Sequence, residues 1–266
     1  MTSATQPIGI FDSGIGGLTV AHAIRQALPH ESIIYFGDTA HLPYGDKSEA
    51  AIQAYSIKIA DILLRHQCKV IVIACHSASS AAYELLTEYV NKKAHIINVI
   101  DPMVERLNHE FLGKTIGLIG TKRTVQSGVY ARKLDSSIQL KALATPLLAP
   151  MIEEGFFNNQ ISHDIIAKYL SDETLHSISS LILACTHYPL IKKEINAYYQ
   201  EKVTLLDSSE IAAQALADHL RSHQLLTSDP NPSEQFFVSD YTDAFEASTR
   251  LFFQRAVHLQ RHALWD

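Results

Sequence analysis

Short apolar runs alternate with longer amphipathic stretches along most of the chain. Apolar residues in consecutive positions are typical of strands that are buried on both faces, as in parallel sheets. Most such runs in the first half are followed by a stretch with helical spacing, for example 47–66. This order predicts βαβ units on a parallel sheet with helices on both faces, so the fold class is α/β. The strands expected in this half are 8–11, 32–37, 70–74 and 95–100.

A second series of strands and helices repeats the first. The segment IGIFDS at 8–13 matches IGLIGT at 116–121, 108 positions later. The segment VIVIAC, which ends at Cys75, matches SLILAC, which ends at Cys185, 110 positions later. Two nearly equal offsets predict a repeated domain. We therefore expect two similar doubly wound parallel-sheet domains, the first from 1–100 plus 208–266 and the second from 101–207, facing each other across an active-site cleft.

Each half places hydroxyl and thiol side chains where its strands end. The first expected strand of each half ends in a hydroxyl residue, Ser13 or Thr121. A later strand of each half ends in a cysteine with a hydroxyl residue close behind it, Ser77 or Thr186. Ligands of open parallel sheets bind beyond the carboxyl ends of the strands. Both sets should therefore line one cleft.

Composition narrows the class of protein. The 266 residues carry a net charge of −6 and no run of lysine and arginine, which argues against binding nucleic acid. No apolar run reaches the length of a membrane span, and the first residues lack the pattern of a secretory signal. Three cysteines without a CxxC pair favour free thiols in a reducing compartment. We expect a cytoplasmic protein with a small-molecule substrate and no membrane or nucleic-acid partner.

Two thiols that face one small molecule from opposite sides suit a specific task. One thiolate takes a proton from one face of a carbon, and the other thiol returns a proton to the opposite face, which inverts a stereocentre. Cys75 and Cys185 each lie where a strand meets an expected helix start, and the helix dipole would stabilise a thiolate there. Cys68 lies at the other end of its strand and is assigned to packing.

The stretch FDSGIGGLTV offers a carboxylate and three glycines at a strand-to-helix turn. It lacks both the GxGxxG spacing and a P-loop lysine, so a nucleotide site is disfavoured. We expect Asp12 to point into the cleft beside Cys75 and the glycine amides to be free for an anion. The stretch GDTAHLPYGDKS, 37–48, is expected to be a loop that positions a ligand.

Fourteen histidines raise the question of a metal site. The segments HLRSH (His219, His223) and HLQRH (His258, His262) each place two histidines at i and i+4 on an expected helix. Neither has a following glutamate or an obvious third ligand, so solvated helix faces are expected and no metal is assigned. His187, two residues after Cys185, is instead expected to act in catalysis.

These motifs together are similar to those of the glutamate racemases in the aspartate/glutamate racemase family. The resemblance covers nearly the whole chain and is carried by IFDSGIGGLTV, YFGDTAHLPYGDKS, VIACHSASSAA, GLIGTKRTVQSGVY, LLAPMIEEG and LACTHYPLI, in the family's order. It implies an enzyme with two α/β domains that interconverts L- and D-glutamate without a cofactor, pyridoxal phosphate included. Its product would supply bacterial peptidoglycan. A homodimer and a monomer both stay open.

The resemblance also assigns roles to matching positions. Cys75 and Cys185 would be the two acid/base residues, Asp12 would assist Cys75, and Glu153 and His187 would assist Cys185. The substrate would be bound by Asp12, Ser13, Asp38, Tyr44, Gly45, His76, Ser77, Thr121, Thr186 and His187. The family usually has Cys-Asn-Thr where this chain has Cys75-His76-Ser77. The ring of His76 would either replace the amide at the substrate, titrating near neutrality, or turn away from it.

Two other functions stay open at this point. One is a racemase for aspartate or another acidic amino acid. The other is a catalytically silent amino-acid-binding protein on the same fold, although binding alone would require neither cysteine. Both are compatible with the fold class.

Overall fold

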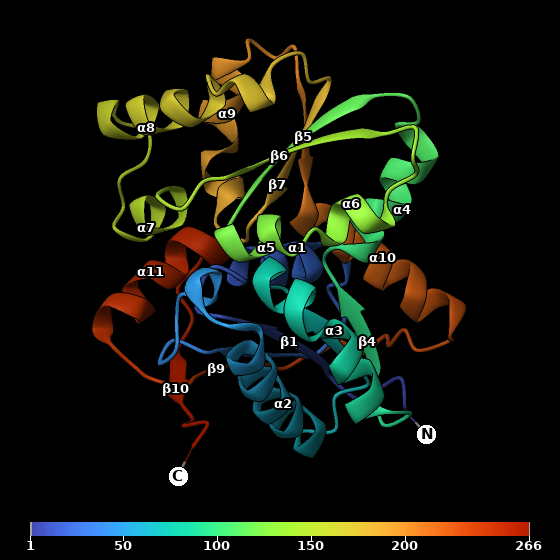
Figure 1. Cartoon of the computed structure of the whole chain (residues 1–266). Helices are drawn as coiled ribbons and strands as arrows, with labels where there is room; N and C mark the ends of the chain where they lie inside the picture. The colour runs from blue at the N-terminus through green and yellow to red at the C-terminus, as the bar shows by residue number, and fades with distance from the viewer. Residues whose placement is uncertain (1, 266) are drawn as a thin grey trace.

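A computed structural model describes residues 2–265 and contains two parallel sheets, one above the other in Figure 1. Sheet A has the strand order β10-β9-β2-β1-β3-β4, and all of its pairings are parallel. Its strands are β1 (Ile8–Asp12), β2 (Ile33–Gly37), β3 (Val70–Ile73), β4 (His95–Asn98), β9 (Glu234–Val238) and β10 (Leu259–Arg261). The beginning and the end of the chain therefore share one sheet.

Helices cover both faces of sheet A, which explains why its strands are apolar at consecutive positions. In β1, Ile10 packs into one apolar cluster and the next residue, Phe11, into another on the opposite face. The cluster of Phe11 includes α2 (Glu49–Arg65) and α3 (His76–Val90), which pack together. The other face is covered by α1 (Leu18–Ala27), α10 (Ser208–Ser222) and α11 (Asp243–Phe253).

Sheet B repeats the central part of sheet A. Its order is β6-β5-β7-β8, formed by β5 (Thr115–Gly120), β6 (Gln139–Ala144), β7 (Ser180–Ala184) and β8 (Thr204–Asp207). Strand β5 lies between β6 and β7 as β1 lies between β2 and β3. The strands that the sequence repeat pairs, β1 with β5 and β3 with β7, thus hold equivalent places.

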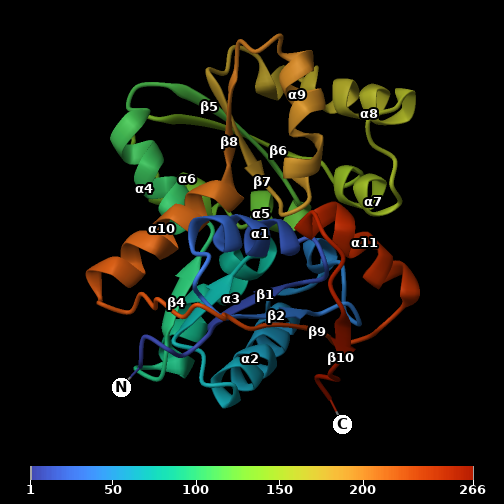
Figure 2. The ribbon, with the colours of Figure 1, turned by 180° about the vertical axis from the view of Figure 1, so that it is seen from behind.

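The helices of the second half lie on both sides of sheet B. Helices α4 (Asp101–Glu110) and α6 (Val129–Lys133) lie on one side, and α8 (Gln160–Leu170) and α9 (Lys192–Tyr198) on the other (Figures 1 and 2). The short helices α5 (Lys122–Gln126) and α7 (Leu148–Glu153) lie at the edge of sheet B that faces sheet A (Figure 1). The expected fold of two parallel-sheet α/β domains is confirmed. Their boundaries at 100/101 and 207/208 stay a prediction.

One sequence expectation about secondary structure is wrong. The segment HLQRH does not form a helix, because residues 259–261 form β10 at the edge of sheet A, parallel to β9. Backbone hydrogen bonds to β9 determine the conformation of this segment. Because β9 lies outside the segment, the local sequence does not predict the strand. Among residues 2–265, no helix is both long enough and apolar enough to cross a membrane.

Candidate active site

The carboxyl ends of β1, β3, β5 and β7 meet at a cavity of about 190 Å³ between the two sheets. Side chains from both halves of the chain form its wall, as expected from the repeat. Both Cys75 and Cys185 belong to this wall. The other predicted site residues on it are Ser13, Tyr44, Gly45, His76, Ser77, Thr121, Glu153, Thr186 and His187.

Cys75 is the N-cap residue of α3, so its thiol lies at the positive end of a helix. Its Sγ accepts a hydrogen bond from the amide of Ala78 at 3.4 Å and donates to Oγ of Ser13 at 3.6 Å. Burial and the nearby Asp12 carboxylate outweigh these contacts and raise the pKa of Cys75 to about 12. In the free site Cys75 is therefore a thiol, ready to donate a proton.

Cys185 has a different environment, because its thiol contacts the ring of His187 and that ring contacts the carboxylate of Glu153. Nδ1 of His187 lies 3.6 Å from Sγ of Cys185, and Nε2 of the same ring lies 2.8 Å from Oε1 of Glu153. Burial alone would disfavour a charged ring, but its hydrogen bonds to Cys185 and Glu153 prevail and raise the pKa of His187 well above its usual value. The charged ring thus lies between the Cys185 thiol and the Glu153 carboxylate.

The expectation of a helix start at Cys185 is wrong. Residues Tyr188–Ile191 form a 3-10 turn, and the α-helix α9 begins only at Lys192. Pro189 sits in this turn, where it has no amide hydrogen to donate. At Cys185 the nearby positive charge therefore comes from the His187 ring, whereas at Cys75 it comes from the dipole of α3.

Hydroxyl groups from the two halves meet beside the thiols. Oγ of Ser77 lies 2.9 Å from Oγ1 of Thr121, which also caps the N-terminus of α5. A Cβ added at Gly45 would lie 3.0 Å from Cβ of Thr121, so this turn approaches the second domain closely. On the other side, Oγ1 of Thr19 donates to the carbonyl of Thr186 at 2.8 Å. Sequence reasoning missed Thr19, since a buried helical threonine carries no signal of its own.

Asp12 lies behind the wall of the cavity rather than on it, and it is fully buried. Its Oδ2 accepts hydrogen bonds from the amides of Gly17 at 2.9 Å and Gly14 at 3.3 Å. A Cβ at Gly17 would lie 2.4 Å from Cβ of Asp12, which explains the glycine. The expectation that these amides are free for an anion is therefore wrong, because Asp12 itself is that anion. Burial raises the pKa of Asp12.

Asp38 is also buried, and it contacts Tyr44, a residue of the cavity wall. Its carboxylate accepts from the hydroxyl of Tyr44 at 2.6 Å and from Oγ of Ser239 at 2.6 Å, and it lies 2.7 Å from Nδ1 of His41. Three partners fix this carboxylate, which in turn holds the Tyr44 ring at the cavity wall. Asp38 thus lies behind the cavity wall, as Asp12 does, and contacts the cavity through Tyr44.

His76 lines the cavity, but one ring nitrogen is directed elsewhere. The hydroxyl of Ser208 donates to the carbonyl of Leu183 at 3.1 Å, so it accepts from Nε2 of His76 at 3.1 Å. Nδ1 of His76 is buried and has no hydrogen-bond partner among the described residues. Burial lowers the pKa of His76 to about 3. The expectation that this ring titrates near neutrality is wrong, because the cavity excludes the water that would solvate its charge.

An apolar part of the wall was not expected from the sequence. It belongs to two of the motifs named in the sequence analysis. The sequence of these motifs does not distinguish residues of the cavity wall from residues of the apolar core. Its members are Leu42, Pro43, Ala149 and Pro150. They give the cavity an apolar side in addition to its hydroxyl and thiol groups.

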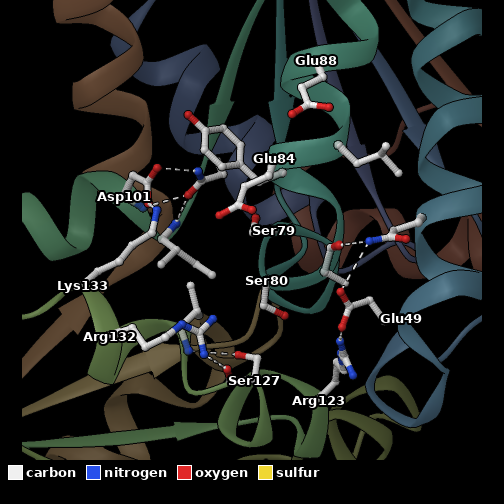
Figure 3. Close-up of a pocket in the computed structure, with 17 residues that line it drawn as sticks. Glu49, Ser79, Ser80, Glu84, Glu88, Asp101, Arg123, Ser127, Arg132 and Lys133 are labelled. Atoms are coloured by element: carbon white, nitrogen blue, oxygen red, sulfur yellow. Dashed lines mark hydrogen bonds and ion pairs between the residues drawn. The ribbon is translucent and has the colours of Figure 1, made fainter.

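A second and larger hollow of about 380 Å³ lies between α3 and the helices of the second domain (Figure 3). Its rim carries two ion pairs: Arg123 with Glu49 joins the two domains, and Lys133 with Asp101 lies within the second domain. Neither Cys75 nor Cys185 lines it. The smaller cavity is therefore the one that both thiols line.

Comparison with known proteins decides the family. The family model described as Asp/Glu/Hydantoin racemase matches residues 18–216. The chain belongs to this aspartate/glutamate racemase family. It is an amino-acid racemase, and thus an isomerase, since curated relatives with high coverage have this activity in their names. The glutamate racemase of Geobacter metallireducens is 40% identical to it over 90% of this chain and 89% of the relative. That of Thermus thermophilus is 39% identical over 99% of both chains.

Solved structures agree with this assignment of the racemase. Glutamate racemase from Francisella tularensis in complex with D-glutamate has a TM-score of 0.91 and 36% identity, covering 98% of this chain and 99% of that one. The Thermus thermophilus enzyme in complex with beta-chloro-D-alanine has a TM-score of 0.90 and 38% identity, covering 99% of both. An aspartate racemase from Picrophilus torridus, at 20% identity and a TM-score of 0.58, shares the fold.

Proposed function

We propose that this racemase interconverts L- and D-glutamate. Relatives named glutamate racemase match nearly the whole chain, and one solved relative is bound to D-glutamate. The observation that carries the mechanism is that Cys75 and Cys185 reach one cavity from different domains. Aspartate racemases are similar only at the level of the fold, so nothing in the comparison favours aspartate. A silent binding protein would require neither thiol nor the His187–Glu153 pair.

The proposed reaction moves one proton on each face of the α-carbon. The Cys185 thiolate takes the α-proton from one enantiomer, and the Cys75 thiol delivers its own proton to the opposite face. The product leaves Cys75 as thiolate and Cys185 as thiol, which is the state that accepts the other enantiomer. The two thiols account for both transfers, so the proposal requires no cofactor.

The different surroundings of the two thiols assign their resting states. The imidazolium of His187 stabilises a thiolate at Cys185, while burial and Asp12 hold Cys75 as the thiol. We infer that the free enzyme rests with one proton shared unequally between the pair. Asp12 thereby assists Cys75 through its charge, and Glu153 assists Cys185 by holding the imidazolium.

Hydroxyl groups are proposed to bind the substrate's amino and carboxylate groups. Four of them, together with the Tyr44–Gly45 turn and His76, surround the cavity. Their arrangement suits a zwitterion, since hydroxyls both donate and accept hydrogen bonds. The four are Ser13, Ser77, Thr121 and Thr186. Asp12 and Asp38 lie behind these groups, where Asp12 accepts from the amides of the glycine turn and Asp38 accepts from the hydroxyl of Tyr44.

The cellular role follows from the proposed product. D-Glutamate would enter bacterial peptidoglycan, which makes the enzyme part of cell-wall synthesis. A cytoplasmic location and the lack of a nucleic-acid partner stay predictions of the sequence, and the oligomeric state stays open.

The substrate is tested by following the enzyme in deuterium oxide with L-glutamate and, separately, L-aspartate. We expect L-glutamate to lose its optical rotation and its α-proton signal together, because each inversion introduces a deuteron from the thiol. L-Aspartate should keep both for far longer. Faster turnover of aspartate, or exchange of the α-proton without inversion, would contradict the proposal.

The role of His187 is tested with His187→Asn. Replacing a charged hydrogen bond worth about 1.5–3 kcal/mol should lower kcat/KM by about 10- to 100-fold. The loss must be equal in both directions, because the equilibrium constant between enantiomers is one. The deuterium isotope effect with α-deuterated substrate should instead rise for the enantiomer that Cys185 deprotonates and fall for the other, since the transfer at Cys185 becomes rate-limiting.

Glu153→Gln should shift the two isotope effects in the same sense by a smaller amount, and Cys68→Ala should leave them as in the parent. Isotope effects that change equally for both enantiomers in His187→Asn would contradict the assignment of His187 to Cys185.

A further inference from the structure

Three histidine rings gather at the edge of the first domain, far from the racemisation cavity along α10. His219 lies in the last turn of α10, and His223 caps its C-terminus. The third ring belongs to His95, the first residue of β4, which lies beside α10 in the fold (Figures 1 and 2). The ring centroids are 4.1 to 5.0 Å apart. The third ligand that the sequence did not reveal is therefore His95.

The ring nitrogens converge on a common point. One ligand nitrogen from each ring lies within 4.8 Å of the other two. A tetrahedral ion with metal–nitrogen distances of about 2.0–2.1 Å holds its ligands roughly 3.3 Å apart. Binding of an ion would require the rings to rotate about their side-chain bonds, and the stacked rings of His219 and His223 to turn their nitrogens toward one point.

The hydrogen bonds of the cluster leave lone pairs for a metal. Nε2 of His219 is buried and has no hydrogen-bond partner among the described residues, which is costly for an isolated ring. Nδ1 of His223 lies 2.9 Å from the carbonyl of His219. This bond fixes the ring and leaves Nε2 as the ligand atom, an arrangement typical of metal-bound histidines.

The local electrostatics favour a nearby cation. Neutral imidazole is the form that binds metal. The C-terminus of α10 carries the negative end of the helix dipole, which favours a cation there. A surface pocket lined by Lys92, Ala94 and Leu225 along with His95 and His223 gives access to the rings.

We propose that His95, His219 and His223 form a binding site for one divalent transition-metal ion, with a water as fourth ligand. Three imidazoles without a carboxylate suit Zn²⁺, Cu²⁺ or Ni²⁺ rather than Mg²⁺ or Ca²⁺, which prefer oxygen. The ion would join β4 to the C-terminal end of α10. The N-terminal residue of the same helix, Ser208, contacts His76 at the cavity. The site is thus separate from the proton-transfer chemistry.

Cobalt is a suitable probe, because tetrahedral Co²⁺ absorbs visible light far more strongly than hydrated Co²⁺. The full chain is treated with a chelator and titrated with Co²⁺ at neutral pH, in a Cys75→Ser/Cys185→Ser background that removes the cavity thiols as competing ligands. We expect one equivalent to bind with intense visible bands, and Zn²⁺ to displace it. Bound metal should also raise the thermal unfolding midpoint.

His223→Ala is the decisive variant, because the side chain is exposed and the fold does not depend on it. We expect a loss of affinity of at least tenfold and weaker visible bands, and the same for His95→Ala. His258→Ala, an exposed histidine of the other i,i+4 pair, is the matched control and should bind as the parent does. The proposal is overturned if no tetrahedral spectrum forms, or if His223→Ala binds Co²⁺ as tightly as the control.

Discussion

Cys75→Ala and Cys185→Ala are each expected to lower the rate of racemisation by about 10²- to 10⁴-fold or more, without loss of the fold. A positioned acid or base typically contributes this much, and inversion cannot proceed when one face of the carbon has no proton donor. Both side chains are small and lie at the cavity wall, so their removal leaves the sheets intact. The measurement is optical rotation, with circular dichroism as the check on folding.

The two single variants should differ in a way that identifies each thiol. In Cys75→Ala, the remaining thiolate removes the α-proton of one enantiomer only, and that enantiomer should slowly gain deuterium without inverting. In Cys185→Ala the other enantiomer should do so. Cys68 is the control, because it is buried in the apolar cluster behind β1 and β3, and Cys68→Ala should racemise normally. Near-normal racemisation by Cys185→Ala would rule out the two-thiol mechanism.

His76→Asn is expected to make the protein less sensitive to acid. The ring of His76 has a folded-state pKa of about 3 because it is buried, whereas an unfolded histidine titrates near 6.5. Below pH 6.5 the unfolded chain therefore binds a proton that the folded protein excludes, so stability is lost as the pH falls from about 6.5 toward 3. At pH 4.5 this difference amounts to about 2–3 kcal/mol of unfolding free energy.

The experiment compares urea unfolding at pH 7 and pH 4.5 for the parent and for His76→Asn. The parent should lose about 2–3 kcal/mol more than the variant between the two pH values, since contributions from all other groups cancel in the comparison. His109→Asn, at an exposed histidine of α4, should behave as the parent. The same pH dependence in parent and His76→Asn would mean that the ring is not buried as a neutral group. His76→Asn should stay active, because asparagine is the usual residue of the resembled family at this position.

The surroundings of the two thiols also make a more general point about this racemase. Inversion treats both enantiomers alike at equilibrium, yet the two halves of the site are built differently. One thiol has a helix N-terminus and a buried carboxylate, and the other has a charged histidine. In the proposed mechanism such asymmetry decides which thiol carries the proton, whereas two thiols in identical environments would share it equally.

Local sequence by itself determined most of the fold. Buried strands of a parallel sheet are apolar at consecutive positions because both of their faces are covered, so strands such as β1, β2, β3 and β7 could be predicted from their apolar runs. The carboxyl ends of parallel strands meet at one edge of a sheet, so the sequence was enough to place Ser13 with Cys75 at one edge and Thr121 with Cys185 at another. The packing of the two sheets against each other then brings both edges to one cavity.

Only the tertiary structure decided the features that depend on partners distant in the chain. The edge strand β10 forms because β9 offers hydrogen bonds to it. The amides of Gly14 and Gly17 are occupied because Asp12 folds back on them, and His76 stays neutral because Ser208 and the surrounding core exclude water from it. His95 meets His219 and His223 because β4 packs against α10. Charge, burial and ligand sets are properties of neighbours in space, which periodicity along the chain does not encode.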